Sequence, residues 1–257
     1  MSANHLVYVL SKIEFMGITE GRFSSLVEEF IEKFRLHYPI FDSNKVREGI
    51  EIKLNDGGVP RIEKIEQRIC VLLSMNSDWS IRLSTDSLVV QTKVYKNFAG
   101  LSERIEPVLQ FIKSKFEINY LKSVSIRYIN NFDYNPDYDF KDVIKRRDFL
   151  QPDLNGWRKG GSNLSSTYVI EDNAVAINSG IALNGTKIPP ELFDISSDFA
   201  DFSSTVKGPM ALLDINSFYI PRRKGESNDF NINEILDKLS ELRDNANIIF
   251  NDIVITQ

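Results

Sequence analysis

The sequence predicts an α+β fold in which amphipathic helices pack on one face of antiparallel sheets, arranged as two similar halves. Two apolar periods in the 257-residue chain indicate this class. Five segments alternate apolar and polar residues, as strands with one buried face do: residues 5–15, 45–56, 79–84, 88–95 and 123–132. Three segments repeat apolar residues at three- and four-residue steps, which is typical of helices with one apolar stripe: residues 23–34, 98–116 and 232–250. Runs of strands followed by helices are characteristic of α+β proteins.

The first half contains a strand, a helix and then a series of strands. The run "RICVLLSM", residues 68–75, is apolar on both faces, which predicts a central strand covered on both sides. Short polar turns at 76–78 and 85–87 join it to the next two strands. Pro107 lies inside the helical pattern of 98–116, where proline costs about 3 kcal/mol. We therefore expect either a kink at Pro107 or a main helix that starts near Glu106.

The second half follows a segment of different composition. Residues 133–166 are rich in Pro, Gly and Asn and predict a connection with one short helix at 140–147. A hairpin follows at 167–183, turning at Asp172-Asn173, and residues 209–220 predict a further strand. Asn231 and Glu234 form a capping pattern before the last helix, and residues 252–256 predict a short closing strand.

These patterns divide the chain into an N-terminal α+β half at 1–132, a connecting segment at 133–166 and a C-terminal α+β half at 167–257. Each half has antiparallel strands, then one amphipathic helix, then a short strand. A degenerate duplication and the mere recurrence of a common strand-helix-strand order explain this equally well.

Composition limits the classes of function. The formal net charge of −5 and the pI of 5.3 disfavour nucleic-acid binding over the whole surface, although a local basic patch stays open. Cys70 is the one cysteine and lies in an apolar run, which predicts a buried thiol and no disulfide. The N-terminus lacks the basic region of a signal peptide, and the apolar runs are shorter than the 18 or so residues that span a membrane. We expect a cytoplasmic protein.

Several motifs occur in a specific order. "WSIRLSTDSL" is followed by "YKNF", an apolar helix and "IRYINN", and later by "LDIN" and a helix ending near Phe250. This order resembles a sporadically distributed bacterial family of uncharacterised proteins of about this length, with a Trp strand and an Arg-Tyr-Ile-Asn strand. Asn131 departs from that family, whose members often carry Arg or Lys there. The resemblance implies no reaction, cofactor or catalytic residue. The family's patchy occurrence resembles that of phage-defence (antiviral) and toxin–antitoxin genes and implies a role of that kind.

No known catalytic motif is present in the sequence. It contains no Gly-x-Gly-x-x-Gly after a strand, no Walker loop, no Gly-x-Ser-x-Gly elbow and no His-Glu-x-x-His. With His5 and His37 as its two histidines, the chain offers few ligands for a transition metal. We therefore assign no catalytic residue, no metal ligand and no cofactor.

The candidate binding residues are all basic. Strand parity places Arg82, Lys93 and Arg127 on the sheet face opposite the helices, together with the polar residues Ser80, Ser84, Gln91 and Ser125. Two clusters lie in predicted loops: Lys145, Arg146 and Arg147, and Arg222, Arg223 and Lys224. Such groups suit an anionic ligand or an acidic partner. The alternative is an ordinary solvated sheet face with solvated loop ends.

The leading hypothesis is a non-enzymatic interaction or binding protein that recognises a protein partner or an anionic ligand, in phage defence or a toxin–antitoxin system. One alternative is a metal-dependent enzyme acting on nucleotides or nucleic acids, with acids such as Asp198 and Asp214 holding the metal. Another is a small-molecule sensor subunit. Sheet edges are compatible with a homodimer, a nucleic-acid partner stays open, and no membrane association is expected.

Overall fold

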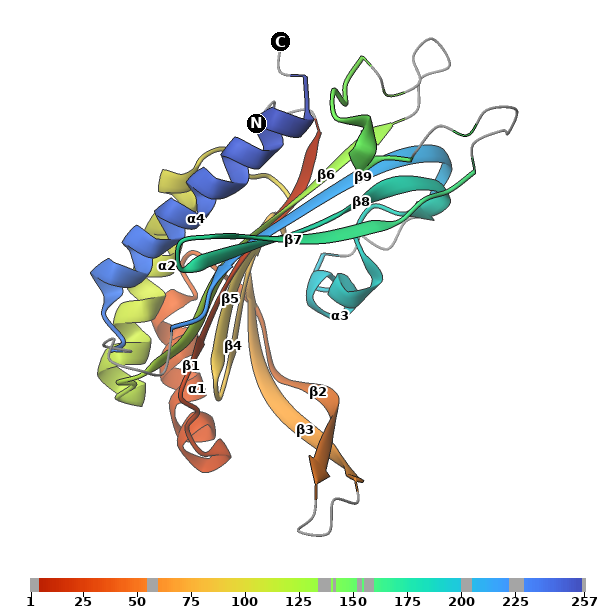
Figure 1. Ribbon diagram of the computed structural model, residues 1–257. Helices are drawn as coiled ribbons and strands as arrows, with labels where there is room; N and C mark the ends of the chain where they lie inside the picture. The colour runs from red at the N-terminus through yellow and green to blue at the C-terminus, as the bar shows by residue number, and fades with distance from the viewer. Residues whose placement is uncertain are drawn as a thin grey trace.

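Nine antiparallel strands form one twisted sheet that organises the chain (Figure 1). The computed structural model describes residues 5–54, 60–133, 140, 142–151, 154, 160–199, 205–221 and 229–255. The strand order is β2-β3-β4-β5-β1-β6-β9-β8-β7. The strands are β1 (Leu6–Phe15), β2 (Ile40–Leu54), β3 (Pro60–Leu73), β4 (Trp79–Ser84), β5 (Ser87–Thr92), β6 (Leu121–Asp133), β7 (Leu164–Ile170), β8 (Asn173–Thr186) and β9 (Thr205–Tyr219). The helices are α1 (Glu20–Phe34), α2 (Phe98–Phe111), α3 (Phe193–Ser196) and α4 (Ile232–Ile253), with short turns η1 (Ile112–Phe116), η2 (Arg147–Phe149) and η3 (Pro190–Leu192).

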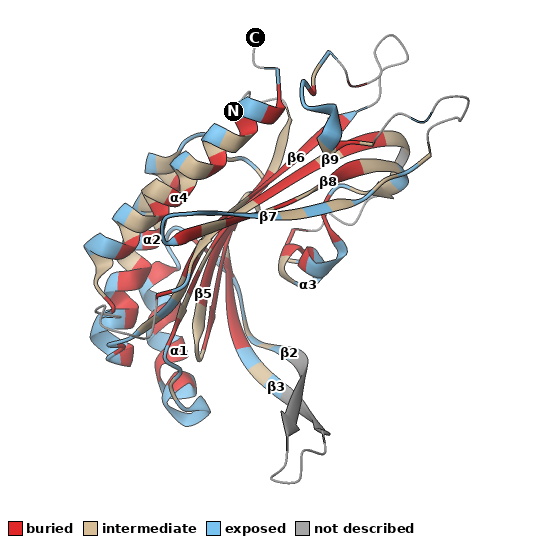
Figure 2. Cartoon of the chain, in the orientation of Figure 1, coloured by how far each residue is buried: buried red, intermediate tan, exposed pale blue. Residues whose placement is uncertain are grey.

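The three long helices cover one face of the sheet, and the short helix α3 lies on the other (Figure 1). Alternate strand residues pack in two cores. Val9 and Ile13 of β1 join the main core beneath the helices, whereas Tyr8 and Leu10 join a smaller core on the face of α3. Burial is concentrated in the middle of the strands and on the inner sides of the helices, as Figure 2 shows. Strand parity thus decides which side chains meet the helices.

The mixed α+β class predicted from the sequence is confirmed. The placement of all helices on one face is not, because α3 packs against the opposite face. The similarity of two halves is not confirmed either. The boundary at residue 132 falls inside β6, which pairs with β9 along ten residues of each strand, from Val124 opposite Tyr219 to Asp133 opposite Met210. The sheet is therefore continuous across both predicted halves.

Helix α2 starts at Phe98 and continues through Pro107, so the second of the two alternatives, a main helix starting near Glu106, is wrong. Asn97 caps the first turn by accepting a hydrogen bond from the Gly100 N–H at 2.9 Å. Leu101 and Ile105 are fully buried before the proline. Their burial and the cap stabilise the first turns and offset the hydrogen bond that Pro107 cannot donate.

Three further local predictions differ from the structure. A closing strand was predicted at 252–256; helix α4 extends to Ile253, and the described part of that range, 252–255, forms no strand beyond a single bridge from Val254 to Ile144. The helix predicted at 140–147 is not formed in its described residues, where Ile144 makes that bridge and a 3-10 turn follows at Arg147–Phe149. Strand β3 lies next to the edge strand β2 rather than in the middle of the sheet, but Ile69–Leu72 are buried on both faces, as predicted.

Gly180 is a position at which only glycine fits. Its φ is +155°, and a Cβ there would lie 2.2 Å from the Ser162 carbonyl oxygen. We expect Gly180→Ala to lower the free energy of unfolding by about 1–3 kcal/mol, because the backbone of a neighbouring segment must move. Gly21, in the first turn of α1, has no atom within 4 Å of a built Cβ. Gly21→Ala is the matched control and should stabilise by about 0.5–1 kcal/mol in urea unfolding.

In the part of the chain that the structure describes, no helix combines the length and the apolar character needed to cross a membrane.

Candidate functional site

Arg82, predicted as a binding residue, lies on the sheet face opposite the long helices and is paired there with two carboxylates. Its side chain is 4% exposed and that of Asp198 is 1% exposed. The Arg82 Nε and Nη2 groups donate to the two oxygens of Asp198 at 2.8 and 2.9 Å, a bidentate geometry. Nη1 donates to Asp194 Oδ2 at 3.1 Å. Arg82 therefore binds two acids of the chain itself.

Asp198 is surrounded by further donors. Ser80 Oγ, Lys45 Nζ and Gln91 Nε2 donate to it at 2.7, 2.9 and 2.8 Å. Burial alone would raise the pKa of Asp198, but the hydrogen bonds and charge of Arg82, with Ser80 and Lys45, hold it below its usual value. The carboxylate is thus fixed in its ionised form by donors on three strands and cannot easily change partners.

Arg127 repeats the arrangement on β6. Its Nε and Nη2 groups donate to the two oxygens of Asp214 at 2.7 and 2.5 Å, and Nη2 also donates to Glu191 at 2.6 Å. The Asp214 side chain is fully buried, and Asn178 Nδ2 donates to it at 3.2 Å. The charge of Arg127 is therefore compensated within the chain as well.

The two arginines hold one segment against the sheet. Arg82 contacts Asp194 and Asp198, Arg127 contacts Glu191, and all three acids lie in or beside η3 and α3. The same segment buries apolar side chains in the smaller core, which comprises Tyr8, Leu10, Val89, Ile129, Ile188, Leu192 and Phe199. The surface expected to receive an external anion is thus covered by carboxylates of the chain.

The other predicted basic residues lie apart from this pair. Lys93 follows β5 and donates its backbone N–H to the Asp78 carbonyl at 3.2 Å. Lys145 donates to the Asn251 carbonyl at 2.8 Å, beside the C-terminal end of α4. Arg146 pairs with Asp148 and Asp252, both at 2.7 Å. Arg147 is exposed at the start of η2. Arg222, Arg223 and Lys224 lie outside the described residues.

The lowered pKa of Asp198 predicts how stability depends on pH. A carboxylate whose pKa is lowered by folding stabilises the folded protein at every pH above its pKa in the unfolded chain, about 3.9. That stabilisation is lost as the pH falls through the pKa of the carboxylate in the folded protein. We expect the difference in unfolding free energy between the wild type and Asp198→Asn to be constant near neutral pH and to narrow below about pH 4. Urea unfolding at a series of pH values measures it, and a difference that stays constant into the acid range would contradict it.

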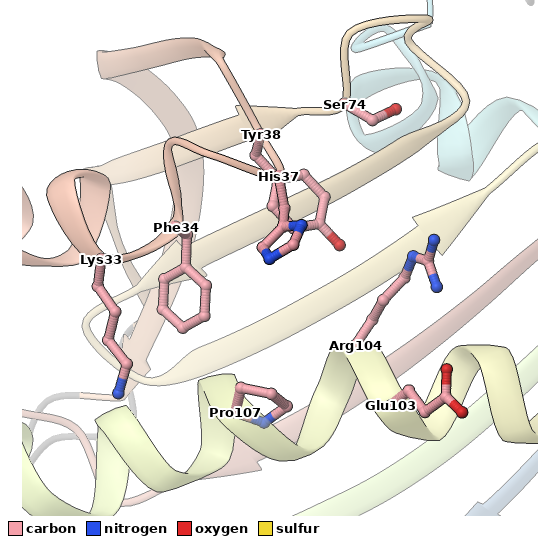
Figure 3. Close-up of a pocket in the computed structure, with 8 residues that line it drawn as sticks. All are labelled: Lys33, Phe34, His37, Tyr38, Ser74, Glu103, Arg104 and Pro107. Carbon is pink, nitrogen blue, oxygen red and sulfur yellow. The ribbon is translucent and has the colours of Figure 1, made fainter.

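A groove on the helix side of the sheet offers space for a ligand, whereas the opposite face around Arg82 and Arg127 is covered by the α3 segment. One pocket of about 510 Å³ lies between the end of α1 and the side of α2. Figure 3 shows Lys33, Phe34, His37 and Tyr38 facing Glu103, Arg104 and Pro107 across it, with Ser74 at one end. A second pocket of about 700 Å³ shares Ser74, Glu103 and Arg104, so the two adjoin. We call them together the α1–α2 groove; its second part is also lined by Asn76, Asp78, Trp79, Val94, Lys96, Asn97, Ala99 and Gly100.

The walls of the α1–α2 groove are fixed by local hydrogen bonds. Ser74 Oγ accepts from the Asp78 and Trp79 N–H groups, both at 3.1 Å, which closes the β3–β4 turn and positions the indole. Thr92 Oγ1 donates to the Asp78 carbonyl at 2.8 Å. On the other side, the cap at Asn97 fixes the start of α2. The β3–β4 turn and the start of α2 are therefore held in place by the protein's own hydrogen bonds, as in a pre-formed ligand site.

Arg104 lies where the two pockets meet. Its guanidinium stacks on the Trp79 ring, 4.1 Å from the ring centroid, and Nη1 donates to the Gly100 carbonyl at 2.9 Å. Burial raises the pKa of Tyr38 to about 12, and the nearby charge of Arg104 opposes this shift. No carboxylate of the described residues forms an ion pair with Arg104. In contrast to Arg82 and Arg127, this half-buried arginine has a charge that an external anion can still compensate.

Asp198 and Asp214, the acids considered as metal ligands, are paired with arginines. Both oxygens of Asp198 and of Asp214 accept hydrogen bonds from arginine. Over the residues that the structure describes, no group of three or more His, Cys, Asp or Glu side chains is placed to hold a metal ion. Cys70 is fully buried, and burial raises the pKa of its thiol to about 12, which keeps it protonated and unreactive near neutral pH.

The sequence pattern gives no sign of the α1–α2 groove. Trp79 packs against the main core on the helix side, but its partner Arg104 is one polar residue among several on an amphipathic helix. The helical period does not indicate that the Arg104 guanidinium stacks on an indole from a turn that is distant in the sequence. A scan against protein-family models found no match to the chain, and a search of curated proteins found none either.

Proposed function

We propose that the chain is a non-enzymatic binding protein and that the α1–α2 groove receives an anionic ligand. Arg104 is the observation that carries this proposal. A half-buried guanidinium that stacks on an indole and has no carboxylate partner among the described residues is a favourable site for a carboxylate or phosphate. Lys33 lines the first pocket and Lys96 the second, so both add positive charge to the groove, against Glu103 and Asp78.

The lining also suggests what else the ligand contains. Phe34, Pro107 and Trp79 offer apolar and aromatic surface next to the cationic groups. A ligand with an anionic group and a planar or apolar part matches both. A nucleotide and an acidic, aromatic segment of a protein partner share that chemistry. A nucleotide would fit the hypothesis of a small-molecule sensor subunit, and an acidic segment would fit the hypothesis of a protein-interaction module. The same groove could bind either ligand.

Binding is favoured over catalysis because Asp198 and Asp214, the acids of the enzyme alternative, are held by Arg82 and Arg127. A role in phage defence or a toxin–antitoxin system is part of the proposal and is supported by the resemblance of the Arg127–Asn130 strand and its neighbours to the sporadic bacterial family. Plaque formation on a bacterial host carrying the wild-type gene or an Arg104→Gln gene would test that role.

The binding experiment has two arms, a panel of nucleotides and a set of acidic peptides containing Phe or Tyr. We expect one arm to raise the melting temperature, since a ligand at 100 times its Kd adds about 2.7 kcal/mol to the folded state. Arg104→Gln should weaken binding by about 10–100-fold in isothermal titration calorimetry, because a charge-assisted hydrogen bond is lost. Arg243→Gln is the matched control, since its guanidinium also stacks on an aromatic ring, 4.8 Å from the Phe98 centroid, but does not line the groove.

Two results would count against the proposal. One is the absence of a thermal shift in both arms, or a shift that Arg104→Gln leaves unchanged. The other is metal-dependent cleavage of nucleotides or nucleic acid that is lost in a folded Asp214→Asn variant, which would support the enzyme alternative instead.

A further inference from the structure

Among the residues that the structure describes, strand β7 forms an edge of the sheet that no other strand covers. It is the last strand in the order, and its seven residues, Leu164–Ile170, include no charged residue and no proline. Tyr168, Val169 and Ile170 are 49%, 76% and 47% exposed. Natural sheets usually block such an edge with charge, proline or a bulge, because its free N–H and C=O groups can pair with another chain.

The opposite edge strand, β2, has the usual protection. Asp42, Lys45 and Arg47 place charge along it, and its pairing with β3 shifts register between Asp42 and Lys45. The two edges of one sheet therefore differ in the features that prevent association. This difference indicates that β7 is kept free for pairing.

We infer that β7 pairs antiparallel with β7 of a second copy of the chain, across a two-fold axis at Thr167. An axis perpendicular to the sheet keeps the helix side of both copies on one side, and placing it at Thr167 pairs all seven residues. Tyr168 then lies opposite Ser166 of the second copy, and Ile170 opposite Leu164. The two sheets join into one.

The charge pattern of the edge fits a second copy in particular. In a two-fold interface every residue recurs, so a strand with charges of one sign would bring like charges together. β7 is neutral, and in this register the exposed Glu171 lies opposite the amide of Asn163 instead of another acid. A neutral strand offers no attraction to a strongly charged partner segment.

An apolar pocket beside the edge adds surface to the same interface. It measures about 330 Å³ and lies between α4 and the β7–β8 hairpin, with Tyr168, Ile170 and Ile248 among its lining residues. Ile248 is 64% exposed. Leu164 of the second copy, opposite Ile170, extends the apolar surface next to this pocket, so pairing covers side chains as well as backbone groups.

Cross-linking tests the register with the full chain. Thr167→Cys places two thiols opposite each other across the axis, within the Cα separation that a disulfide allows. The native Cys70 is buried and does not compete. Ser165→Cys is the matched control, because the two copies of residue 165 would lie about 14 Å apart along the strands. We expect mild oxidation to link Thr167→Cys into a dimer, to leave Ser165→Cys unlinked, and to link a mixture of Ser165→Cys and Val169→Cys.

Sedimentation velocity tests the association without new thiols. The wild type should sediment as a dimer at micromolar concentration, and Thr167→Lys should raise the dimer Kd by about 100-fold, because two lysines then face each other. Val46→Lys, a comparable change at an exposed residue of β2, should leave the dimer intact. A monomeric wild type, a dimer that survives Thr167→Lys, or equal cross-linking of Thr167→Cys and Ser165→Cys would overturn the inference.

Discussion

Asp198→Ala is expected to lower the free energy of unfolding by about 3–5 kcal/mol, because it leaves the buried guanidinium of Arg82 without its bidentate partner. With Asp198 at 1% and Arg82 at 4% exposure, little water can solvate the charge that remains. Ser80 and Gln91 lose an acceptor in the same substitution. Chemical denaturation followed by far-UV circular dichroism measures the change.

Two further variants distinguish the effect of breaking the buried Arg82–Asp198 pair from the effect of removing any charge near Arg82. Asp194→Ala removes the second acid that Arg82 contacts, but Asp194 is 46% exposed and should cost less than about 1 kcal/mol. Arg82→Met combined with Asp198→Leu removes both charges and should recover part of the stability lost in Asp198→Ala, since apolar residues often replace a buried ion pair at little cost. If Asp198→Ala and Asp194→Ala lowered the free energy of unfolding by the same small amount, the Arg82–Asp198 pair would not be what holds α3 against the sheet.

The faces of the central strands were predictable because strand parity is a local property. Arg82 and Arg127 lie opposite the long helices, as the alternation of β4 and β6 indicates, and Ile81 and Ile126 lie beneath them. The partners of those arginines were not predictable. Asp198 is 116 residues from Arg82 and Asp214 is 87 from Arg127, so each pairing depends on how the sheet is assembled.

Helix ends were less predictable than helix faces. The apolar stripe of α2 was found, but whether Pro107 breaks the helix depends on the buried neighbours Leu101 and Ile105, which only the packed structure supplies. Strand β6 ends at Asp133, one residue beyond the predicted range of 123–132, with both asparagines inside it. The Asn130 and Asn131 amide groups donate to the carbonyls of Leu213 and Lys187, at 3.3 and 2.7 Å. Both acceptors are far from the asparagines in the sequence. The two hydrogen bonds keep within the strand a residue type that often occurs in turns.

Phe111→Ala is expected to cost about 3–5 kcal/mol of unfolding free energy, the range for a buried phenylalanine. The ring is 1% exposed and contacts three others, with centroids 5.3 Å from Phe30, 6.2 Å from Phe34 and 6.0 Å from Phe116. Through them it joins α2 and η1 to α1. Phe41→Ala is the control, because Phe41 is 53% exposed on β2 and its loss should change stability by less than about 0.5 kcal/mol.

A double-mutant cycle on Phe30 and Phe111 tests the contact itself. The two rings are tilted by 55°, and such pairs contribute about 0.5–1.5 kcal/mol beyond the apolar area they bury. A coupling energy in that range would show that α1 docks on α2 through these rings. The end of α1 also forms one wall of the α1–α2 groove, so loosening this contact should weaken ligand binding without any change at Arg104. A coupling energy of zero, with both single variants folded, would mean that the two helices are not held together by their rings and that the groove has no fixed wall on the side of α1.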